Sequence, residues 1–321
     1  MHDAYYIRKL VSADTTGRDD AWRIGFAAVA AGDALAAIAA LLRSRFRRRG
    51  VTEPPVAGND LIQLEDRGAY ALLRFNRPDK RNAMSSAARK AFLARLAQLH
   101  GTHKVVVLTG NGPGFCSGVD LKEAAAAEAT GTDHDREALE REWMSVLLAI
   151  HRHPAVFIAA VNGFALGGGS SLIHVCDLAI AADEAEIGMP EMGFGTYPGM
   201  AGPATQLRLL PKHAAYMILT ASRIDGQTAE RWGMVNKSVP LARLLDEADA
   251  LARRVGQFDA TALAESRKAL GLVPGQIGDL AGGFELGLSV NAGIRARSSA
   301  RRDGLGRFAA GEKNPGQGRQ S

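Results

Sequence analysis

Three consecutive glycines, at positions 167–169, separate a short apolar run from a stretch that can form a helix. The run before them, Val156–Val161, contains no polar residue, which is typical of a strand buried on both faces of a parallel sheet. Glycine has no Cβ, so the backbone at this turn can come close to a ligand. Unpaired N–H groups at the start of a helix can then polarise a carbonyl group. The segment therefore predicts a buried sheet with a candidate binding site at its edge.

A single carboxylate, Glu191, follows this turn in a loop rich in glycine and proline. Pro190 and Gly193 flank it, and a rigid loop of this kind can hold a carboxylate against a substrate. Partial burial would raise the pKa of Glu191 toward the working pH of an acid/base group. Upstream, Phe115–Leu121 repeats the arrangement of apolar strand, small residue, glycine and acid. The two segments together indicate a carbonyl-binding site with one proton-transfer group.

Strand-like and helix-like segments alternate along the first two thirds of the chain. Short apolar runs predict strands at residues 63–65, 69–75, 104–109, 156–161 and 178–181. Helices are expected at 85–100 and 132–151 and, after Pro211, at 213–220, 226–232, 241–257 and 260–271. This order predicts an α/β fold with a mainly parallel core, followed by a helical last third.

The composition is that of a globular protein with a small excess of positive charge. Of the 321 residues, 46% are hydrophobic and 23% are charged, which is enough apolar material for a large core. The net charge of +5 favours an anionic ligand without specifying one. Cys116 and Cys176 lie in apolar segments and are expected to be buried and reduced, as in the cytoplasm. No cysteine–histidine group has the spacing of a zinc site, so no metal site is expected.

Residues 1–57 are predicted to be an N-terminal extension. Within it, 20–49 is expected to be an Ala-rich helix whose basic end suits the helix dipole, followed by a Pro54-Pro55 linker. A secretory signal would place its positive charge before the apolar run, and Asp33 interrupts that run, so neither a signal nor a membrane span is expected. The predicted boundaries are 1–57 for the extension, 58–255 for the core, and 256–321 for the C-terminal helices with a mobile tail.

Four motifs follow one another in a fixed order, at Asn76–Ser85, Phe115–Leu121, Asn162–Gly169 and Pro190–Gly199. In this order they resemble the crotonase superfamily, also called the enoyl-CoA hydratase/isomerase family. The resemblance covers roughly residues 59–315 and implies a crotonase-like spiral of ββα units with a C-terminal helical trimerisation region. It further implies a homotrimer or homohexamer that acts on a small-molecule acyl-CoA substrate.

The resemblance also implies roles for individual residues. The N–H groups of Ser117 and Gly168 would form an oxyanion hole for a thioester enolate, and Glu191 would be the acid/base. The substrate would be a coenzyme A thioester, whose phosphates suit the positive net charge, and no prosthetic group is implied. Nucleic acid also suits that charge, but it is not the expected partner. The family segments that contact CoA correspond here to Arg77, Lys80, Arg81, Ala83 and Lys313.

Ser171 departs from the pattern of the two-carboxylate hydratases, which have a second glutamate at this position. A serine can hold a water or a hydroxyl group but does not readily move protons at neutral pH. His174 lies one helical turn further on and could orient Ser171, although a histidine satisfied in the core is the favoured interpretation. Trp143 could line an acyl pocket or simply pack its own helix.

Three functions remain open at this point. The expected one is an enoyl-CoA hydratase/isomerase. The second is a hydroxycinnamoyl-CoA hydratase-lyase, because those enzymes also have serine at the position of Ser171 and a similar run at 176–185. Against this, the tyrosine that holds their phenol has no counterpart at 284–286. The third is a crotonase-fold module that has lost catalysis and binds CoA or another molecule.

Overall fold

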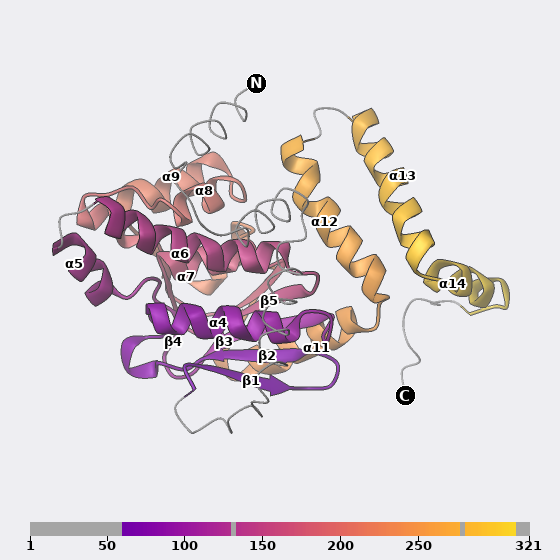
Figure 1. The fold of residues 1–321 in the computed structure, drawn as a ribbon, viewed down its shortest axis with the longest axis horizontal. Helices are drawn as coiled ribbons and strands as arrows, with labels where there is room; N and C mark the ends of the chain where they lie inside the picture. Colours follow the sequence, from indigo (N-terminus) through magenta and orange to yellow (C-terminus); the bar gives the residue numbers. More distant parts are fainter. Residues whose placement is uncertain (1–59, 130–132, 277–279, 313–321) are drawn as a thin grey trace, which may run out of the picture. The chain divides into compact units, whose positions relative to one another are not determined.

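The computed structural model describes residues 60–129, 133–276 and 280–312; the predicted extension lies outside them. Figure 1 shows the chain as a ribbon. Its strands form two sheets. The larger contains, in spatial order, β1 (Ile62–Asp66), β2 (Ala71–Phe75), β3 (Val105–Gly110), β5 (Val156–Val161), β7 (Leu178–Ala182) and β10 (Lys237–Val239). The smaller contains β4 (Gly114–Cys116), β6 (Phe164–Leu166), β8 (Ile187–Gly188) and β9 (Arg223–Ile224). Neighbouring strands are parallel except in the β1–β2 and β8–β9 pairs.

The chain passes repeatedly from the larger sheet to the smaller sheet and then into a helix. Strands β3 and β4 lead to α5 (Leu121–Ala129) and α6 (Asp133–Arg152), and β5 and β6 lead to α7 (Gly168–Val175). Strands β7 and β8 lead to the 3₁₀-helix η2 (Pro190–Phe194) and α8 (Ala201–Gln206). Because β3, β5 and β7 are neighbours in one sheet and β4, β6 and β8 in the other, each repeat stacks on the last. The predicted α/β spiral of ββα units is confirmed.

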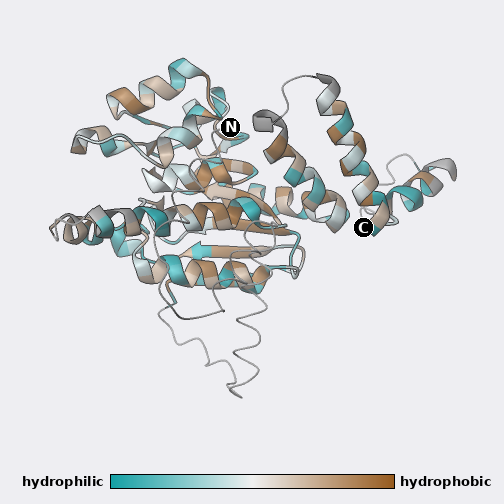
Figure 2. Ribbon diagram, turned by 45° about the horizontal axis from the view of Figure 1, so that its top comes forward, coloured by the Kyte–Doolittle hydropathy of each residue, from teal (hydrophilic) through white to brown (hydrophobic). Residues whose placement is uncertain are grey.

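Helices cover the larger sheet and bury their apolar faces against it. Helix α4 (Ser86–Leu99) starts at Ser85, whose hydroxyl accepts a hydrogen bond from the N–H of Ala88 at 3.3 Å. Its buried face includes Phe92, which packs against Phe75 of β2. Helix α11 (Leu244–Gly256) packs against β3, β5 and β7. Figure 2 shows the hydrophobic residues following the strands, and β3 and β5 are buried along their whole length.

The last third of the described chain is mainly helical, as expected, but it also contains the short strands β9 and β10. It contains α9 (Pro211–Thr220), α10 (Gly226–Arg231), the 3₁₀-helix η3 (Leu241–Arg243), α11, α12 (Ala260–Gln276), α13 (Leu280–Arg297) and α14 (Ala300–Ala309). Helices α12 and α13 contact each other. The role of this region in trimer formation remains a prediction.

Several predicted elements differ in extent. The strand expected from residue 69 begins at Ala71, because the N–H of Arg67 donates to the carbonyl of Tyr70 and closes a turn there. The helix expected at 241–257 is divided into η3 and α11. The one expected at 260–271 continues to Gln276. Helix α5 was not expected at all.

Candidate active site

The turn between β6 and α7 places three glycines where side chains would collide with their surroundings. Gly167, at φ 53°, precedes the helix and provides no side-chain cap, and its own N–H donates to the carbonyl of Gly188 at 2.8 Å. A Cβ on Gly169 would lie 1.8 Å from the carbonyl oxygen of Cys116. The N–H of Gly168 opens the helix and has no intrahelical acceptor. The turn thus presents an uncapped amide, as the sequence predicted.

The carboxylate of Glu191 lies against this turn. Glu191 belongs to the first turn of η2, and a Cβ on Gly167 would be 2.7 Å from its Oε1. Its Oε2 is buried and has no hydrogen-bond partner among the described residues. Burial raises the pKa of Glu191 above its ordinary value, and a hydrogen bond from its own backbone opposes this only partly. A raised pKa and an unpartnered oxygen are typical of a carboxylate that transfers protons to a bound ligand.

The amide of Ser117 does not fit the donor role predicted for it. Its N–H donates to the carbonyl of Arg81 at 3.0 Å, and its hydroxyl donates to the carbonyl of Lys80 at 3.3 Å. An amide that is already paired cannot also stabilise an oxyanion without losing that bond. We therefore correct this assignment.

Val119, two residues further on, has an unpaired amide. Met84 forms both hydrogen bonds of an isolated parallel bridge, donating to the carbonyl of Gly118 at 2.8 Å and accepting from Asp120 at 3.4 Å. The Gly118 carbonyl and the Val119 N–H belong to one trans peptide, so the N–H faces away from Met84. It has no acceptor among the described residues.

Gly118 brings this second segment into contact with the glycine turn. It adopts φ 85°, and a Cβ there would be 2.8 Å from the nitrogen of Gly168. The unpaired amides of Val119 and Gly168 therefore stand on two segments that touch. The sequence signal for Val119 was the glycine before it, which permits the left-handed backbone that turns the next peptide.

Ser171 is buried on α7, and its hydroxyl has no partner among the described residues. His174, one turn further on, is hydrogen-bonded elsewhere: its Nε2 lies 3.0 Å from Oγ1 of Thr205. That hydroxyl donates to the carbonyl of Ala201 at 2.7 Å, so Nε2 carries the proton. Burial, with a smaller effect of Arg208, lowers the pKa of His174 to about 4, and the ring is neutral at pH 7. The interpretation of His174 as a satisfied core residue is supported.

Buried polar atoms without partners gather around the turn. Trp143 Nε1, Ser170 Oγ, Ser171 Oγ and Glu191 Oε2 are four of the five such side-chain atoms in the described residues. Trp143 contacts Gly168, since a Cβ there would lie 2.8–3.0 Å from its indole ring. A buried polar group without a partner costs about 1–3 kcal/mol. Several around one turn indicate a place where a polar ligand or water completes the structure.

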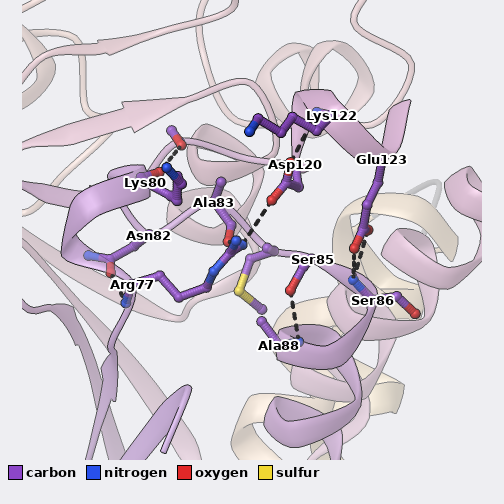
Figure 3. Close-up of polar contacts among 12 residues, drawn as sticks. Arg77, Lys80, Asn82, Ala83, Ser85, Ser86, Ala88, Asp120, Lys122 and Glu123 are labelled. Carbon is purple, nitrogen blue, oxygen red and sulfur yellow. Dashed lines mark hydrogen bonds and ion pairs between the residues drawn. The ribbon is translucent and has the colours of Figure 1, made fainter. Parts of the chain in front are cut away.

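The predicted CoA-binding segment forms a compact turn at η1 (Pro78–Lys80) (Figure 3). The guanidinium of Arg77 donates to the carbonyl of Ala83 at 2.5 Å and to Asp120 at 3.0 Å, so it stabilises the protein itself. The Lys80 ammonium is half-exposed, 3.6 Å from Asp79, and Arg81 lies over the ring of Phe164 at 4.7 Å. Lys313 lies outside the described residues.

Asn82 holds this turn together, a role that the sequence interpretation missed. It is buried at φ 58°, its amide oxygen accepts from the N–H of Arg77 at 2.8 Å, and its amide nitrogen donates to the carbonyl of Gly114 at 2.6 Å. The asparagine in the first motif could have indicated it, since asparagine tolerates left-handed backbone better than most residues.

Within the part of the chain that the structure describes, no group of three or more histidine, cysteine, aspartate or glutamate residues could hold a metal ion. None of the described helices is long and apolar enough to cross a membrane. Cys116 and Cys176 are free and buried, as predicted, and burial raises the pKa of Cys116 to about 12.

Comparison with known proteins shows which sequences and folds this chain resembles. A sequence model of the enoyl-CoA hydratase/isomerase family matches residues 65–271. A hydroxycinnamoyl-CoA hydratase-lyase of Pseudomonas fluorescens is 38% identical over 200 residues, which cover 60% of this chain and 71% of that protein. The 2,3-dehydroadipyl-CoA hydratase of Escherichia coli K12 is 34% identical over 202 residues, covering 62% and 77%. A solved enoyl-CoA hydratase of Mycobacterium smegmatis aligns with a TM-score of 0.73 at 27% identity, covering 78% of this chain and 96% of that one.

Proposed function

Because this chain belongs to the enoyl-CoA hydratase/isomerase family, a family of acyl-CoA-processing enzymes, we propose that it is an enoyl-CoA hydratase/isomerase that works through a thioester enolate. The observation that carries the proposal is the half-buried Glu191 carboxylate, whose Oε2 is buried without a partner among the described residues and which lies against the uncapped α7 turn. A carboxylate beside two unpaired amides can move a proton while the amides stabilise the negative charge that results.

In this proposal the thioester oxygen accepts hydrogen bonds from the N–H groups of Val119 and Gly168. Both amides are unpaired within the described chain, and the segments that carry them touch at Gly118. Backbone amides held by the fold are preorganised donors, so they need little reorganisation when charge develops on the oxygen. The hydrogen bonds from the two amides become stronger as the carbonyl oxygen gains the negative charge of the enolate. They therefore lower the activation barrier of the reaction and do more than bind the substrate.

Glu191 then accepts a proton from a carbon of the acyl chain, or returns one to it. Its raised pKa brings the carboxyl group nearer to the working pH, where it can both accept and return a proton. Ser171, buried and without a partner, would hold water or the substrate by hydrogen bonds rather than act as a second acid.

Coenzyme A would extend along the η1 turn. Lys80 and the exposed part of Arg81 provide positive charge for its phosphates, whereas the internal bonds of Arg77 give it the role of fixing the turn. Main-chain groups near Ala83 and the side chain of Lys313 complete the proposed set. We also propose a cytoplasmic location and a homotrimer or homohexamer, on the strength of the family resemblance.

A hydroxycinnamoyl-CoA hydratase-lyase is the second candidate. It is favoured by the 38% identity to such an enzyme and by Ser171 in place of a second glutamate. The variant Ser171→Glu separates the two candidates, because it introduces a second carboxylate into a site built for one. If the native reaction is carbon–carbon cleavage or isomerisation, this variant should lose native turnover while hydration of short enoyl-CoAs is kept or raised.

The direct test is to incubate the protein with aliphatic and aromatic enoyl-CoAs and to identify the products by mass. A gain of water on aliphatic substrates supports the hydratase, an unchanged mass with a moved double bond supports the isomerase, and aldehyde with acetyl-CoA from a hydroxycinnamoyl thioester supports the lyase. Binding of CoA esters without turnover of any of them would leave a module that has lost catalysis and would refute the proposal.

A further inference from the structure

Trp143, on α6, has a buried indole N–H with no acceptor among the described residues. The side chain is 1% exposed, and Nε1 forms no hydrogen bond. An indole N–H can only donate, and buried tryptophans usually have an acceptor. A residue that only filled space here would be better as phenylalanine, which buries no polar atom. The position therefore indicates an acceptor that the chain itself does not supply.

The indole ring of Trp143 lies against the glycine turn, with Nε1 among its nearest atoms. A Cβ on Gly168 would lie 3.0 Å from Nε1 and 2.8 Å from Cε2 and Cζ2. A Cβ on Gly167 would lie 2.7 Å from the Glu191 carboxylate. The indole and the carboxylate therefore contact adjacent residues of the turn whose amide is proposed to hold the thioester oxygen. An acceptor for the indole must then lie close to the thioester end of a bound ligand.

We propose that the indole N–H of Trp143 donates a hydrogen bond to an oxygen on the acyl chain near the thioester, such as the hydroxyl group of a 3-hydroxyacyl-CoA. This inference rests on the proposed function and assigns Trp143 as a residue that determines which acyl groups the site prefers. An oxygen on the third acyl carbon is two carbons from the carbonyl carbon, which is within reach of a donor beside the carbonyl-binding amide. The indole N–H can only donate, and a methylene group cannot accept a hydrogen bond. The indole therefore favours an acyl chain with an oxygen at this position over one with a methylene group.

The test compares two ligands that differ in this oxygen alone, 3-hydroxybutyryl-CoA and butyryl-CoA, by calorimetric titration. Trp143 is replaced by 3-benzothienylalanine, which keeps the shape of the ring and replaces N–H by sulfur, and separately by phenylalanine. Wild type should bind the hydroxy ester more tightly. The benzothienyl variant should lose about 3–10-fold of that preference, the factor expected for one neutral hydrogen bond, while its affinity for butyryl-CoA is kept.

A control variant and an NMR titration test whether the change in preference comes from the indole N–H of Trp143. Trp232 stacks on His213 at 4.2 Å and serves as the matched control, since the same replacement there should leave the preference unchanged. In protein with ¹⁵N-labelled tryptophan, the indole signal that Trp143→Phe removes should shift with the hydroxy ester and less with butyryl-CoA.

An unchanged preference in the benzothienyl variant, or equal losses for both esters, would overturn the inference and leave the proposed function intact. Absence of any preference in wild type would do the same. If wild type binds neither these esters nor any enoyl-CoA, the proposed function is wrong and the inference falls with it.

Discussion

Partial burial disfavours the charged form of the Glu191 carboxylate. The variant Glu191→Gln keeps the shape and removes the proton acceptor, so kcat should fall by roughly 10²–10⁴, the usual range for a lost general acid/base. Binding of CoA esters, measured by titration, should persist. Full activity of the variant would exclude Glu191 from the mechanism.

The same substitution has an effect on stability with a defined pH dependence. The pKa of Glu191 is raised in the folded protein because the side chain is partly buried. A raised carboxyl pKa means that ionisation opposes folding above the unfolded-state pKa, and that this cost disappears as the pH falls below it. Glu191→Gln should therefore raise the midpoint of thermal unfolding at pH 7, and the gain should shrink at pH 4. A loss of stability at pH 7 would contradict the proposed environment.

If Val119 rather than Ser117 provides the second donor, substitutions at these two positions should affect kcat very differently. Val119→Pro deletes the proposed donor and should lower kcat by about 10²–10³, the range for one lost oxyanion-hole donor. Ser117→Ala removes only a hydroxyl that is bonded to the carbonyl of Lys80, so its effect should be small. Circular dichroism must show that the proline variant is folded. Equal defects in the two variants would restore Ser117 as a participant.

At the scale of helices, Arg89 joins α4, α5 and α6 beside the segment that carries the proposed donor Val119. Its buried guanidinium contacts Glu142 of α6 at 2.5 Å, Glu123 of α5 at 3.2 Å and the carbonyl of Met84 at 2.6 Å. Because Met84 also forms the bridge on either side of Val119, this cluster supports the segment that carries the proposed donor.

Breaking the Arg89 cluster from one side should destabilise the protein. Glu142→Gln leaves a buried guanidinium short of negative charge, and the expected loss is about 3 kcal/mol in the free energy of unfolding by urea. Burial alone would raise the pKa of Glu142, but hydrogen bonds from Arg89 and Ser86 outweigh it, so the pKa is lowered. This contribution is present above pH 4.5 and is lost as the pH falls through the lowered pKa. The double variant Arg89→Met with Glu142→Leu should lose less than the single variant; a larger loss would refute the cluster's role.

Some elements of the site could be predicted from the sequence, and others could not. Gly168 and Glu191 could be named as candidates because each stands in a short motif with a local physical reason. Val119 was not named because its proposed role depends on the left-handed backbone of Gly118, which turns the peptide after it. The contact of Trp143 with Gly168 joins residues of two helices, and no spacing along the chain encodes that approach.

For the whole molecule, the order of strands and helices predicted the architecture well, because the central strands β3 and β5 are continuous apolar runs that are buried along their whole length. Division of the chain into two interleaved sheets was not evident from the strands themselves. It appears only in the pairing of β4, β6, β8 and β9, strands of two or three residues that are too short to give a hydrophobic period.

Assembly is the main prediction at this scale. Phe284 and Leu288 lie one turn apart on α13 and are 64% and 62% exposed, which makes an apolar strip suited to contact with another copy. Light scattering should show a trimer or hexamer, and replacing both residues with aspartate should shift the mass toward monomer. Leu241→Asp, at an exposed apolar position on η3, is the control and should leave the mass unchanged. A wild-type monomer would refute the predicted trimerisation region.

The bridge formed by Met84 has a consequence for how variation in this chain should be interpreted. If the second donor is the main-chain N–H of Val119, every amino acid except proline supplies the same atom. A saturation scan should then show position 119 as permissive to most residues and closed to proline, while position 118 excludes all residues but glycine because of its φ of 85°. A survey by alanine substitution would pass over the donor entirely, and relatives could differ at residue 119 while keeping identical chemistry.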